Sequence, residues 1–360
     1  MNPEFWSGRS VFVTGHTGFK GGWLCLWLER LGARVVGYSL PPPTTPSLYE
    51  AADVGGAMRS LTGDVRDAER LAAAVREARP EVVFHLAAQA IVRSGYEEPV
   101  ETYATNVMGT CHLLEAVRRC PGVRAVVVVT SDKCYADSGE RRAHVEDDPM
   151  GGHDPYSSSK GCAELLTAAY RLSFLGAAGG AEPTVAVATA RAGNVIGGGD
   201  WGEHRLVPDV VRAVAGGEPV RVRSPQAVRP WQHVVSPLSG YLRLAEELCG
   251  RGSEVAEGWN FGPDEDDCRP VSWLVERITR RWGGGASWRP EPHPGFHETS
   301  FLMLDCAKAH DRLLWRPPVE LATAVDWLVD WYRLHAVGGD IRGLTLEQLA
   351  ETERRLLATG

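Results

Sequence analysis

The stretch SVFVTGHTGFKGGWL (residues 10–24) decides the fold, because it predicts a strand, a tight turn and a helix in direct succession. Its first five residues form an apolar, β-branched run that is typical of a buried strand. Gly15, Gly18 and Gly21 follow at GxxGxxG spacing, and a helix is expected over 18–31. Glycines in this context let a pyrophosphate approach the backbone at the helix N-terminus. The stretch therefore predicts a dinucleotide-binding turn.

Short apolar runs alternate with longer helical patterns through the first 191 residues. The expected strands are 34–38, 61–63, 81–87, 123–131 and 184–191, and the expected helices are 67–79, 99–119 and 155–175. The strands are apolar without alternation, which is typical of a parallel sheet covered by helices on both faces. We therefore predict an α/β fold, a Rossmann-like doubly wound parallel sheet with a smaller C-terminal α/β substrate lobe.

The pattern changes after Arg191, where a glycine-rich loop begins and the segments become shorter. We predict three parts. The NAD-binding domain comprises 1–191 with about 233–261 and 316–340, the substrate lobe comprises about 192–232 and 262–315, and 343–360 forms a peripheral C-terminal helix. Within these parts, 233–248 and 318–337 are expected to be helices.

Composition excludes several classes of protein. Hydrophobic residues make up 44% of the 360 residues and charged residues 23%, which excludes wholesale disorder. The net charge of −8 argues against a nucleic-acid partner. No apolar run approaches the about 20 residues of a membrane span, and no signal peptide is recognised, so we expect a cytoplasmic protein. The eight cysteines form no CxxC pair, so reduced thiols and no metal site are expected.

Two signals for catalysis meet at the carboxyl edge of the predicted sheet. Tyr156 and Lys160 lie at i,i+4 spacing, on one face of a predicted helix. The lysine is expected to lower the tyrosine pKa from about 10, which would make Tyr156 a base toward a hydroxyl group. TSDKCY (130–135) ends a buried strand, and parallel sheets bind ligands at the carboxyl ends of their strands.

Together these motifs resemble the extended short-chain dehydrogenase/reductase family, and within it the nucleotide-sugar 4,6-dehydratases. The resemblance rests on VTGHTGFKGGWL (13–24), YSLPPPTTPSLYE (38–50), HLAAQ (85–89), TSDKCY (130–135), DDPMGGHDPYSSSKGCAE (147–164), ARAGNVIGGGDW (190–201) and RPWQHV (229–234). It covers nearly the whole chain up to about residue 240 and is loose beyond it. Asp132-Lys133 resembles the enzymes that act on CDP-glucose and some UDP-N-acetylglucosamine dehydratases, whereas the dTDP-glucose branch has Asp-Glu there. CDP-glucose is therefore the favoured nucleotide-hexose substrate.

The resemblance implies an internal redox cycle with tightly bound NAD. Tyr156 would deprotonate the C4 hydroxyl of glucose while NAD⁺ takes the C4 hydride. The 4-ketone acidifies the C5 proton, water leaves from C6, and the hydride returns to C6. The product would be a 4-keto-6-deoxy sugar.

The roles of the Asp132-Lys133 pair stay open at this point. Asp132 can be the acid at the C6 oxygen if it is protonated in a desolvated site. Lys133 can be the C5 base only if its pKa falls about three units from 10.4, and burial near Lys160 together with the positive nicotinamide ring is the expected source of that shift. Otherwise Asp132 serves both steps, or Lys133 steadies the enolate or acts only as an ion-pair partner.

The resemblance also assigns the binding residues. The predicted cofactor site is Gly15, Thr17, Gly18, Phe19, Lys20, Gly21, Asp64, Val65, Leu86, Ala87, Ala88, Gln89, Asn106, Thr130, Tyr156 and Lys160. The predicted substrate site is Gln89, Ser131, Asn194, Arg205, Arg229 and His233, and the predicted catalytic residues are Ser131, Asp132, Lys133, Tyr156 and Lys160. The second strand ends at Gly37-Tyr38-Ser39, with neither an acid for a ribose hydroxyl nor an arginine for a 2′-phosphate. The end of this strand therefore does not distinguish NAD from NADP.

Alternative functions are a 4,6-dehydratase or 4-epimerase of another nucleotide hexose, and a non-catalytic dinucleotide-binding sensor. An epimerase needs only the tyrosine–lysine pair and would leave Asp132-Lys133 without a role. A homodimer is expected from the resemblance, through the helices at 99–119 and 155–175.

Overall fold

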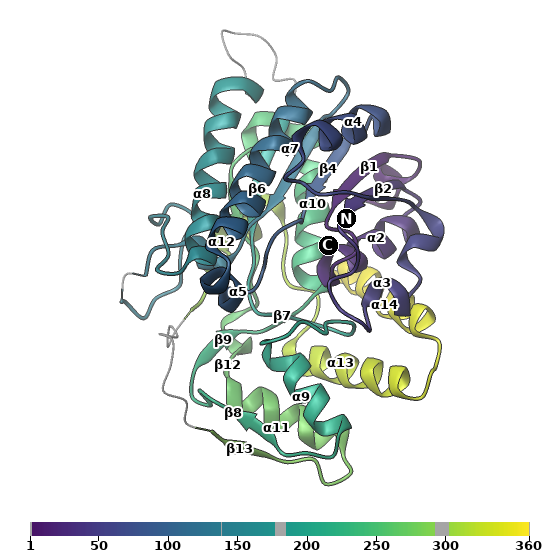
Figure 1. The fold of residues 1–360 in the computed structure, drawn as a ribbon, viewed down its shortest axis with the longest axis vertical. Helices are drawn as coiled ribbons and strands as arrows, with labels where there is room; N and C mark the ends of the chain where they lie inside the picture. The colour runs from purple at the N-terminus through teal and green to yellow at the C-terminus, as the bar shows by residue number, and fades with distance from the viewer. Residues whose placement is uncertain (1, 138, 177–184, 292–301, 360) are drawn as a thin grey trace.

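The computed structural model describes residues 2–137, 139–176, 185–291 and 302–359 (Figure 1). A seven-stranded parallel sheet forms its centre, with the strand order β11-β6-β5-β4-β1-β2-β3. The strands are β1 Ser10–Thr14, β2 Arg34–Ser39, β3 Arg59–Thr62, β4 Val82–His85, β5 Ala125–Val129, β6 Ala186–Arg191 and β11 Gly258–Asn260. The predicted Rossmann-like sheet is confirmed.

Helices cover both faces of this sheet, which explains the strands that are apolar without alternation. On β5, Val127 and Val129 pack into one hydrophobic core, while Val126 and Val128 pack into the other. The first core includes residues of α2 (Phe19–Arg30) and α10 (Val235–Arg251), and the second includes residues of α4 (Ala68–Ala78) and α7 (Gly109–Arg118). Successive strand residues point to opposite faces, so both must be apolar.

The helix boundaries follow the sequence pattern, with local departures. The predicted helix at 99–119 is α6 (Pro99–Tyr103), a π-helical turn (Ala104–Met108) and α7 in succession. The predicted helix at 155–175 is α8 (Pro155–Tyr170) followed by a π-helical turn (Arg171–Leu175). Residue 184, the first of a predicted strand, lies outside the described residues. The remaining helices are α1 Pro3–Trp6, α3 Leu48–Ala51, α5 Val92–Glu97, α9 Leu206–Ala215, α11 Val271–Trp282, α12 Ala307–Leu313, α13 Leu321–Ala336 and α14 Ile341–Thr359.

A smaller lobe lies beyond the carboxyl end of β6, below the sheet in Figure 1. Its short strands form three two-stranded sheets, which pair β7 with β10, β9 with β12, and β8 with β13. They are β7 Val195–Ile196, β8 Val220–Val222, β9 Val228–Pro230, β10 Gln232–His233, β12 Cys268–Pro270 and β13 Trp288–Pro290. Helices α9 and α11 pack beside them. Residues 292–301 of the predicted lobe lie outside the described residues, and the division into domains stays a prediction.

The C-terminal helix α14 packs against α2, far from it in sequence (Figure 1). Trp27 and Arg30 of α2 both donate hydrogen bonds to the Glu353 carboxylate, and Arg342 pairs with Glu29. Leu349 is fully buried. The helix begins two residues before the predicted segment, and residue 360 lies outside the described residues. None of the helices in the described ranges is both long and apolar enough to cross a bilayer.

Candidate active site

The glycine turn between β1 and α2 has the shape that a diphosphate requires. Gly15 has φ +79°, and a Cβ there would lie 2.7 Å from the backbone nitrogen of Ala87. A Cβ on Gly21 would overlap the carbonyl oxygen of Gly15. Gly18 caps α2 without a side-chain hydrogen bond, so the first N–H groups of the helix are left for a ligand. These residues fit the diphosphate of NAD.

Other predicted cofactor residues lie around this turn at the carboxyl edge of the sheet. Asp64 forms a bidentate pair with Arg66, which holds the pKa of the carboxyl below its usual range. Val65 is buried directly beneath Gly109, where a Cβ would clash with its side chain. The hydroxyl of Thr17 donates to the carbonyl of Leu40 at 2.9 Å. Leu86, Ala87 and Ala88 follow β4 and are half-buried.

Lys20 lies nearer to the catalytic residues than its position in the glycine turn suggested. Its Nζ lies 3.4 Å from the hydroxyl of Tyr241, on α10. Burial lowers the pKa of Lys20 to about 7, and the charges of Lys160 and Arg205 act in the same direction. Its neighbour Phe19 lies beside Gly197 of the glycine-rich loop after β6.

Asn106 connects the segment after β4 to the catalytic helix. Its side-chain amide donates to the carbonyl of Gln89 at 3.0 Å and to the hydroxyl of Ser159 at 2.8 Å, while its oxygen accepts from the Gln89 N–H. The Gln89 side chain donates to Thr102. Asn106 lies in the π-helical turn, and such turns occur frequently at functional sites. Asn106 therefore braces α8 against the predicted cofactor site.

The predicted catalytic residues Ser131, Asp132 and Tyr156 come together at the end of β5. The hydroxyl of Ser131 donates to Asp132 Oδ1 at 3.0 Å and is in hydrogen-bond contact with the Tyr156 side chain. The three side chains are 5%, 2% and 8% exposed, so water is largely excluded. A Cβ on Gly193 would overlap the Asp132 carboxylate, so only glycine leaves room for this arrangement.

The predicted effect of Lys160 on the tyrosine is wrong for this structure. Burial raises the pKa of Tyr156 to about 12 and outweighs the opposing effect of the hydrogen-bond contact with Ser131. Lys160 is buried, its Nζ donates to the carbonyl of Val129 at 3.2 Å, and burial lowers its pKa to about 8. Desolvation disfavours both charged forms at once, so the pair is not held as phenolate and ammonium by these residues alone.

Lys133 is exposed, whereas its proposed role as the C5 base was expected to involve burial near Lys160. It lies in a short 3₁₀ turn, Asp132–Cys134, in which both neighbours are buried. The turn therefore places adjacent residues in opposite environments.

A buried ion pair that the sequence motifs did not reveal supports the catalytic turn. Arg191, the last residue of β6, forms a bidentate pair with Glu164 of α8 at 3.0 and 2.9 Å. Thr130 and Thr189 also donate to the same carboxylate. Glu164 lies one helical turn beyond Lys160. The i,i+4 spacing of Tyr156, Lys160 and Glu164 along one helix face could therefore have pointed to Glu164 in the sequence. The carboxylate joins the ends of β5 and β6 to the catalytic helix.

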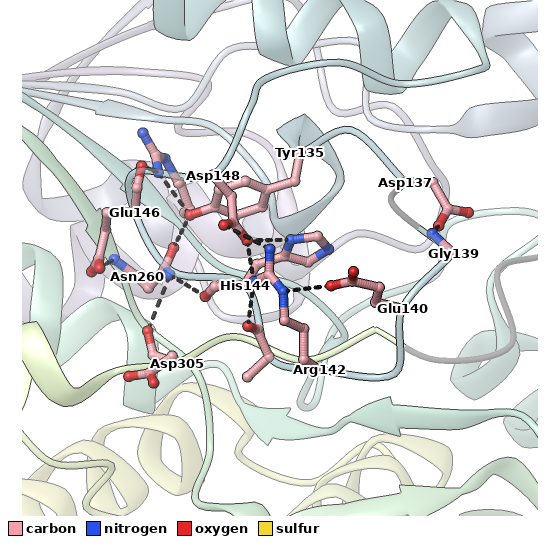
Figure 2. A network of polar contacts seen from close by, with 12 residues as sticks. Tyr135, Asp137, Gly139, Glu140, Arg142, His144, Glu146, Asp148, Asn260 and Asp305 are labelled. Atoms are coloured by element: carbon pink, nitrogen blue, oxygen red, sulfur yellow. Dashed lines mark hydrogen bonds and ion pairs between the residues drawn. The ribbon is translucent and has the colours of Figure 1, made fainter.

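Hydrogen bonds extend this support to the loop between β5 and α8 (Figure 2). The Tyr135 hydroxyl donates to Asn260 at 2.6 Å, and the Tyr135 ring stacks on His144 with centroids 4.7 Å apart. Asn260 in turn donates to the carbonyls of His144 and Asp305. His144 contacts Asp148 at 2.9 Å. The loop and the segment around Asp305 are thereby fastened to the base of the catalytic turn.

The predicted substrate residues after β6 differ in their surroundings. Asn194 has φ +48°, and its amide lies 3.4 Å from Asp132 Oδ2. Arg205 pairs with Asp200 at 3.0 Å and lies within electrostatic reach of Tyr156. Arg229 lies on β9 and is half-buried.

His233 does not face open space. It is fully buried, and its ring packs edge-to-face against Trp23 and Trp327. Burial lowers its pKa to about 3. The structure therefore gives no support to a direct substrate contact by this side chain.

Metal ligation was not expected from the sequence, and within the described ranges no three His, Cys, Asp or Glu residues gather as a metal site. All eight cysteines are free thiols, and burial raises the pKa of Cys134 beside the catalytic turn. The site is thus built from one hydroxyl, one carboxylate, one phenol and several amines.

Comparison with known proteins agrees with this geometry. The profile described as the NAD dependent epimerase/dehydratase family matches residues 11–254. The chain is 48% identical over 343 residues to a CDP-glucose 4,6-dehydratase of Salmonella typhimurium, with 95% of each chain covered. It is 27% identical to a dTDP-glucose 4,6-dehydratase of Xanthomonas campestris pv. campestris, over 89% of this chain and 92% of the relative. A solved structure of dTDP-glucose 4,6-dehydratase from Bacillus anthracis in complex with NAD has the same fold. Its TM-score is 0.76 at 20% identity, and 92% of this chain and 99% of that chain are covered.

Proposed function

The chain belongs to the NAD dependent epimerase/dehydratase family, and we propose that it is a 4,6-dehydratase that converts CDP-glucose to CDP-4-keto-6-deoxyglucose and water. The observation that carries the proposal is the buried Asp132 carboxylate beside Ser131 and Tyr156. A 4-epimerase needs a base for one hydroxyl only, whereas elimination also needs an acid for the departing oxygen. We propose Asp132 as that acid.

The first step is removal of the C4 hydroxyl proton, and Tyr156 is the proposed base. The Ser131 side chain already contacts the phenol, so it can hold the sugar hydroxyl between the two groups. Burial raises the pKa of Tyr156 to about 12, so the phenol needs added positive charge to ionise at neutral pH. Lys160 supplies such charge when protonated. Bound NAD would supply the acceptor of the C4 hydride, the donor to C6 and a positive ring.

The elimination step is assigned to Asp132 and Lys133 in different roles. A buried carboxyl group can hold a proton and deliver it to the C6 oxygen as water leaves. Because Lys133 is exposed, we propose that it steadies the enolate that forms at C4 and C5 and is not the base. Asp132 then serves both proton transfers, from C5 and to the C6 oxygen. Gly193 permits this position because any side chain there would displace the carboxylate.

The lobe is proposed to hold the nucleotide diphosphate of the substrate. Arg205 and Arg229 are half-buried on the lobe side, and Asn194 reaches Asp132. Guanidinium groups bind phosphate oxygens in bidentate fashion. The similarity to the CDP-glucose enzyme supports CDP as the nucleotide.

The decisive experiment offers the purified enzyme CDP-, dTDP-, UDP- and GDP-glucose in parallel and follows the products by NMR. We expect CDP-glucose to be converted to a 4-keto-6-deoxy product faster than the other three substrates. Turnover of a different nucleotide hexose would refute the CDP assignment and keep the dehydratase. An epimer at C4 as the product would refute the dehydratase assignment.

We also propose that two copies of the chain pair through α8 and α6. Leu165 on α8 is 62% exposed, Leu172 in the π-helical turn after α8 is 77% exposed, and Val100 on α6 is 81% exposed. These helices contact one another, so we infer that the exposed apolar side chains share one face; Met108 and Phe174 are exposed on the adjoining π-helical turns. Isologous faces of this kind suit a second copy of the same chain.

Sedimentation of Leu165→Glu tests the pairing. We expect this variant to sediment as a monomer and the wild type as a dimer. Leu357→Glu is the matched control, because Leu357 is 72% exposed on α14 and should leave the dimer intact. A wild-type monomer would contradict the proposal.

We place the enzyme in the cytoplasm, where its free cysteines would stay reduced.

A further inference from the structure

The end of β2 has no acidic residue that could bind the hydroxyl groups of the adenosine ribose. Two side-chain hydroxyl groups lie there instead, in hydrogen-bond contact with each other. Ser39 is the last residue of β2, and Thr17 lies in the glycine turn. Their oxygens are 2.8 Å apart, and the Thr17 hydroxyl also donates to the carbonyl of Leu40 at 2.9 Å. Both residues keep a small exposed surface, 9% for Ser39 and 7% for Thr17.

The direction of these hydrogen bonds can be worked out from the number of protons. Thr17 has one hydroxyl proton, and the carbonyl of Leu40 can only accept it. The contact between the two hydroxyl groups must then use the proton of Ser39. Both protons are therefore committed within the protein, and the Ser39 oxygen retains lone pairs for a donor. A neutral serine in this state acts as an acceptor, as a carboxylate would.

The arginines and the histidine described near the end of β2 already bind protein groups. Among the described residues nearby, Arg66 is paired with Asp64 and Glu101, and Arg70 donates to the carbonyl of Thr62. His16 is buried and bonded to Ser60 at 2.7 Å, and burial lowers its pKa to about 4, so it is uncharged. A 2′-phosphate brings about two negative charges and only acceptor oxygens at neutral pH.

We propose that the Thr17–Ser39 hydroxyl pair selects NAD over NADP, because it can accept the ribose 2′-hydroxyl proton and offers no hydroxyl proton to a 2′-phosphate. Ser39 thus takes the place of the acidic residue that usually ends this strand in NAD-binding folds. The inference rests on NAD binding by the chain and not on the proposed sugar chemistry. Its tests use no sugar nucleotide, so a failure here is distinguishable from a failure of the dehydratase proposal.

Binding constants for three probes, NAD, NADP and 2′-deoxyadenosine NAD, test the proposal by calorimetry on protein freed of nucleotide. Wild type should bind NAD about 100-fold more tightly than NADP. Ser39→Ala should weaken the binding of NAD about fivefold. It should leave the binding of 2′-deoxyadenosine NAD unchanged, because that probe lacks the 2′-hydroxyl group. Equal weakening of both probes would overturn the proposal, because the loss would then not come from the 2′-hydroxyl.

Two further variants complete the test. Thr17→Val should free the Ser39 proton and so reduce the preference for NAD over NADP about fivefold; an unchanged preference would contradict the proton assignment. Ser60→Ala is the matched control, because this serine lies on the neighbouring strand and its hydroxyl is bonded to His16 and Tyr49. Its NAD to NADP ratio should equal that of wild type, and a change as large as that of Ser39→Ala would overturn the assignment. Thermal unfolding of each variant shows whether it is folded.

Discussion

The two sides of the candidate site differ in how firmly the fold holds them. On the sheet side, Asp132, Tyr156 and Lys160 are 2%, 8% and 6% exposed and are tied to the strand ends. On the lobe side, Arg205 keeps 35% of its side chain exposed and Arg229 is half-buried. A rigid group can be aligned for bond making, while a more exposed group suits binding. We infer that the sheet side carries the chemistry and the lobe side selects the substrate.

The largest effect is expected from Tyr156→Phe, which removes the proposed base without emptying its space. The turnover rate should fall about 10³-fold, because a positioned base contributes on this scale. Binding of CDP-glucose should change little. Stopped-flow absorbance of reduced nicotinamide, compared with wild type, measures the C4 oxidation directly. C4 oxidation at the wild-type rate would show that a residue other than Tyr156 is the base.

A smaller effect, about 10²-fold, is expected from Lys133→Met, and it should fall on elimination alone. C4 oxidation should proceed, so reduced nicotinamide should accumulate in a single turnover. Lys133→Arg separates the two roles, because arginine keeps its charge and cannot act as a neutral base. If Lys133 only steadies the enolate, Lys133→Arg should regain most of the elimination rate. An arginine variant as slow as the methionine variant would identify Lys133 as the base.

The buried support of the sheet side should show itself in stability. Glu164→Gln leaves the Arg191 guanidinium buried without its counter-charge, which should cost about 3 kcal/mol of unfolding free energy. Glu77→Gln is the matched control, since the Arg59–Glu77 pair is exposed and should contribute less than about 1 kcal/mol. Urea denaturation measures both. Equal losses in the two variants would contradict the structural role of the buried pair.

On the lobe side, Arg205→Lys should raise the KM for CDP-glucose about tenfold and leave the turnover rate nearly unchanged. The reason is that lysine keeps the charge but loses the planar fork that grips phosphate oxygens. Steady-state kinetics over a range of substrate concentrations gives both constants. A fall in the turnover rate with an unchanged KM would mean that Arg205 contributes to the chemical steps. It would then contradict the assignment of chemistry to the sheet side and of binding to the lobe side.

The sheet side was largely predictable because its signals are local. The glycine turn, the β-branched strands and the Tyr156–Lys160 spacing each lie within a short stretch of sequence. The lobe strands contain two or three residues, and β8 pairs with β13 almost seventy residues away, so no local period marks them. Burial also depends on distant neighbours. For that reason the exposed Lys133, the enclosed His233 and the raised pKa of Tyr156 could not be foreseen.

The central claim is that one hydride leaves C4 and returns to C6 of the same sugar. CDP-glucose deuterated at C4, incubated with the enzyme and examined by ²H and ¹H NMR, tests it most directly. The proposal predicts a 4-keto-6-deoxy product with the deuterium in its C6 methyl group. Deuterium back at C4 of an epimerised sugar, or its absence from the C6 of a dehydrated product, would contradict the proposed hydride return.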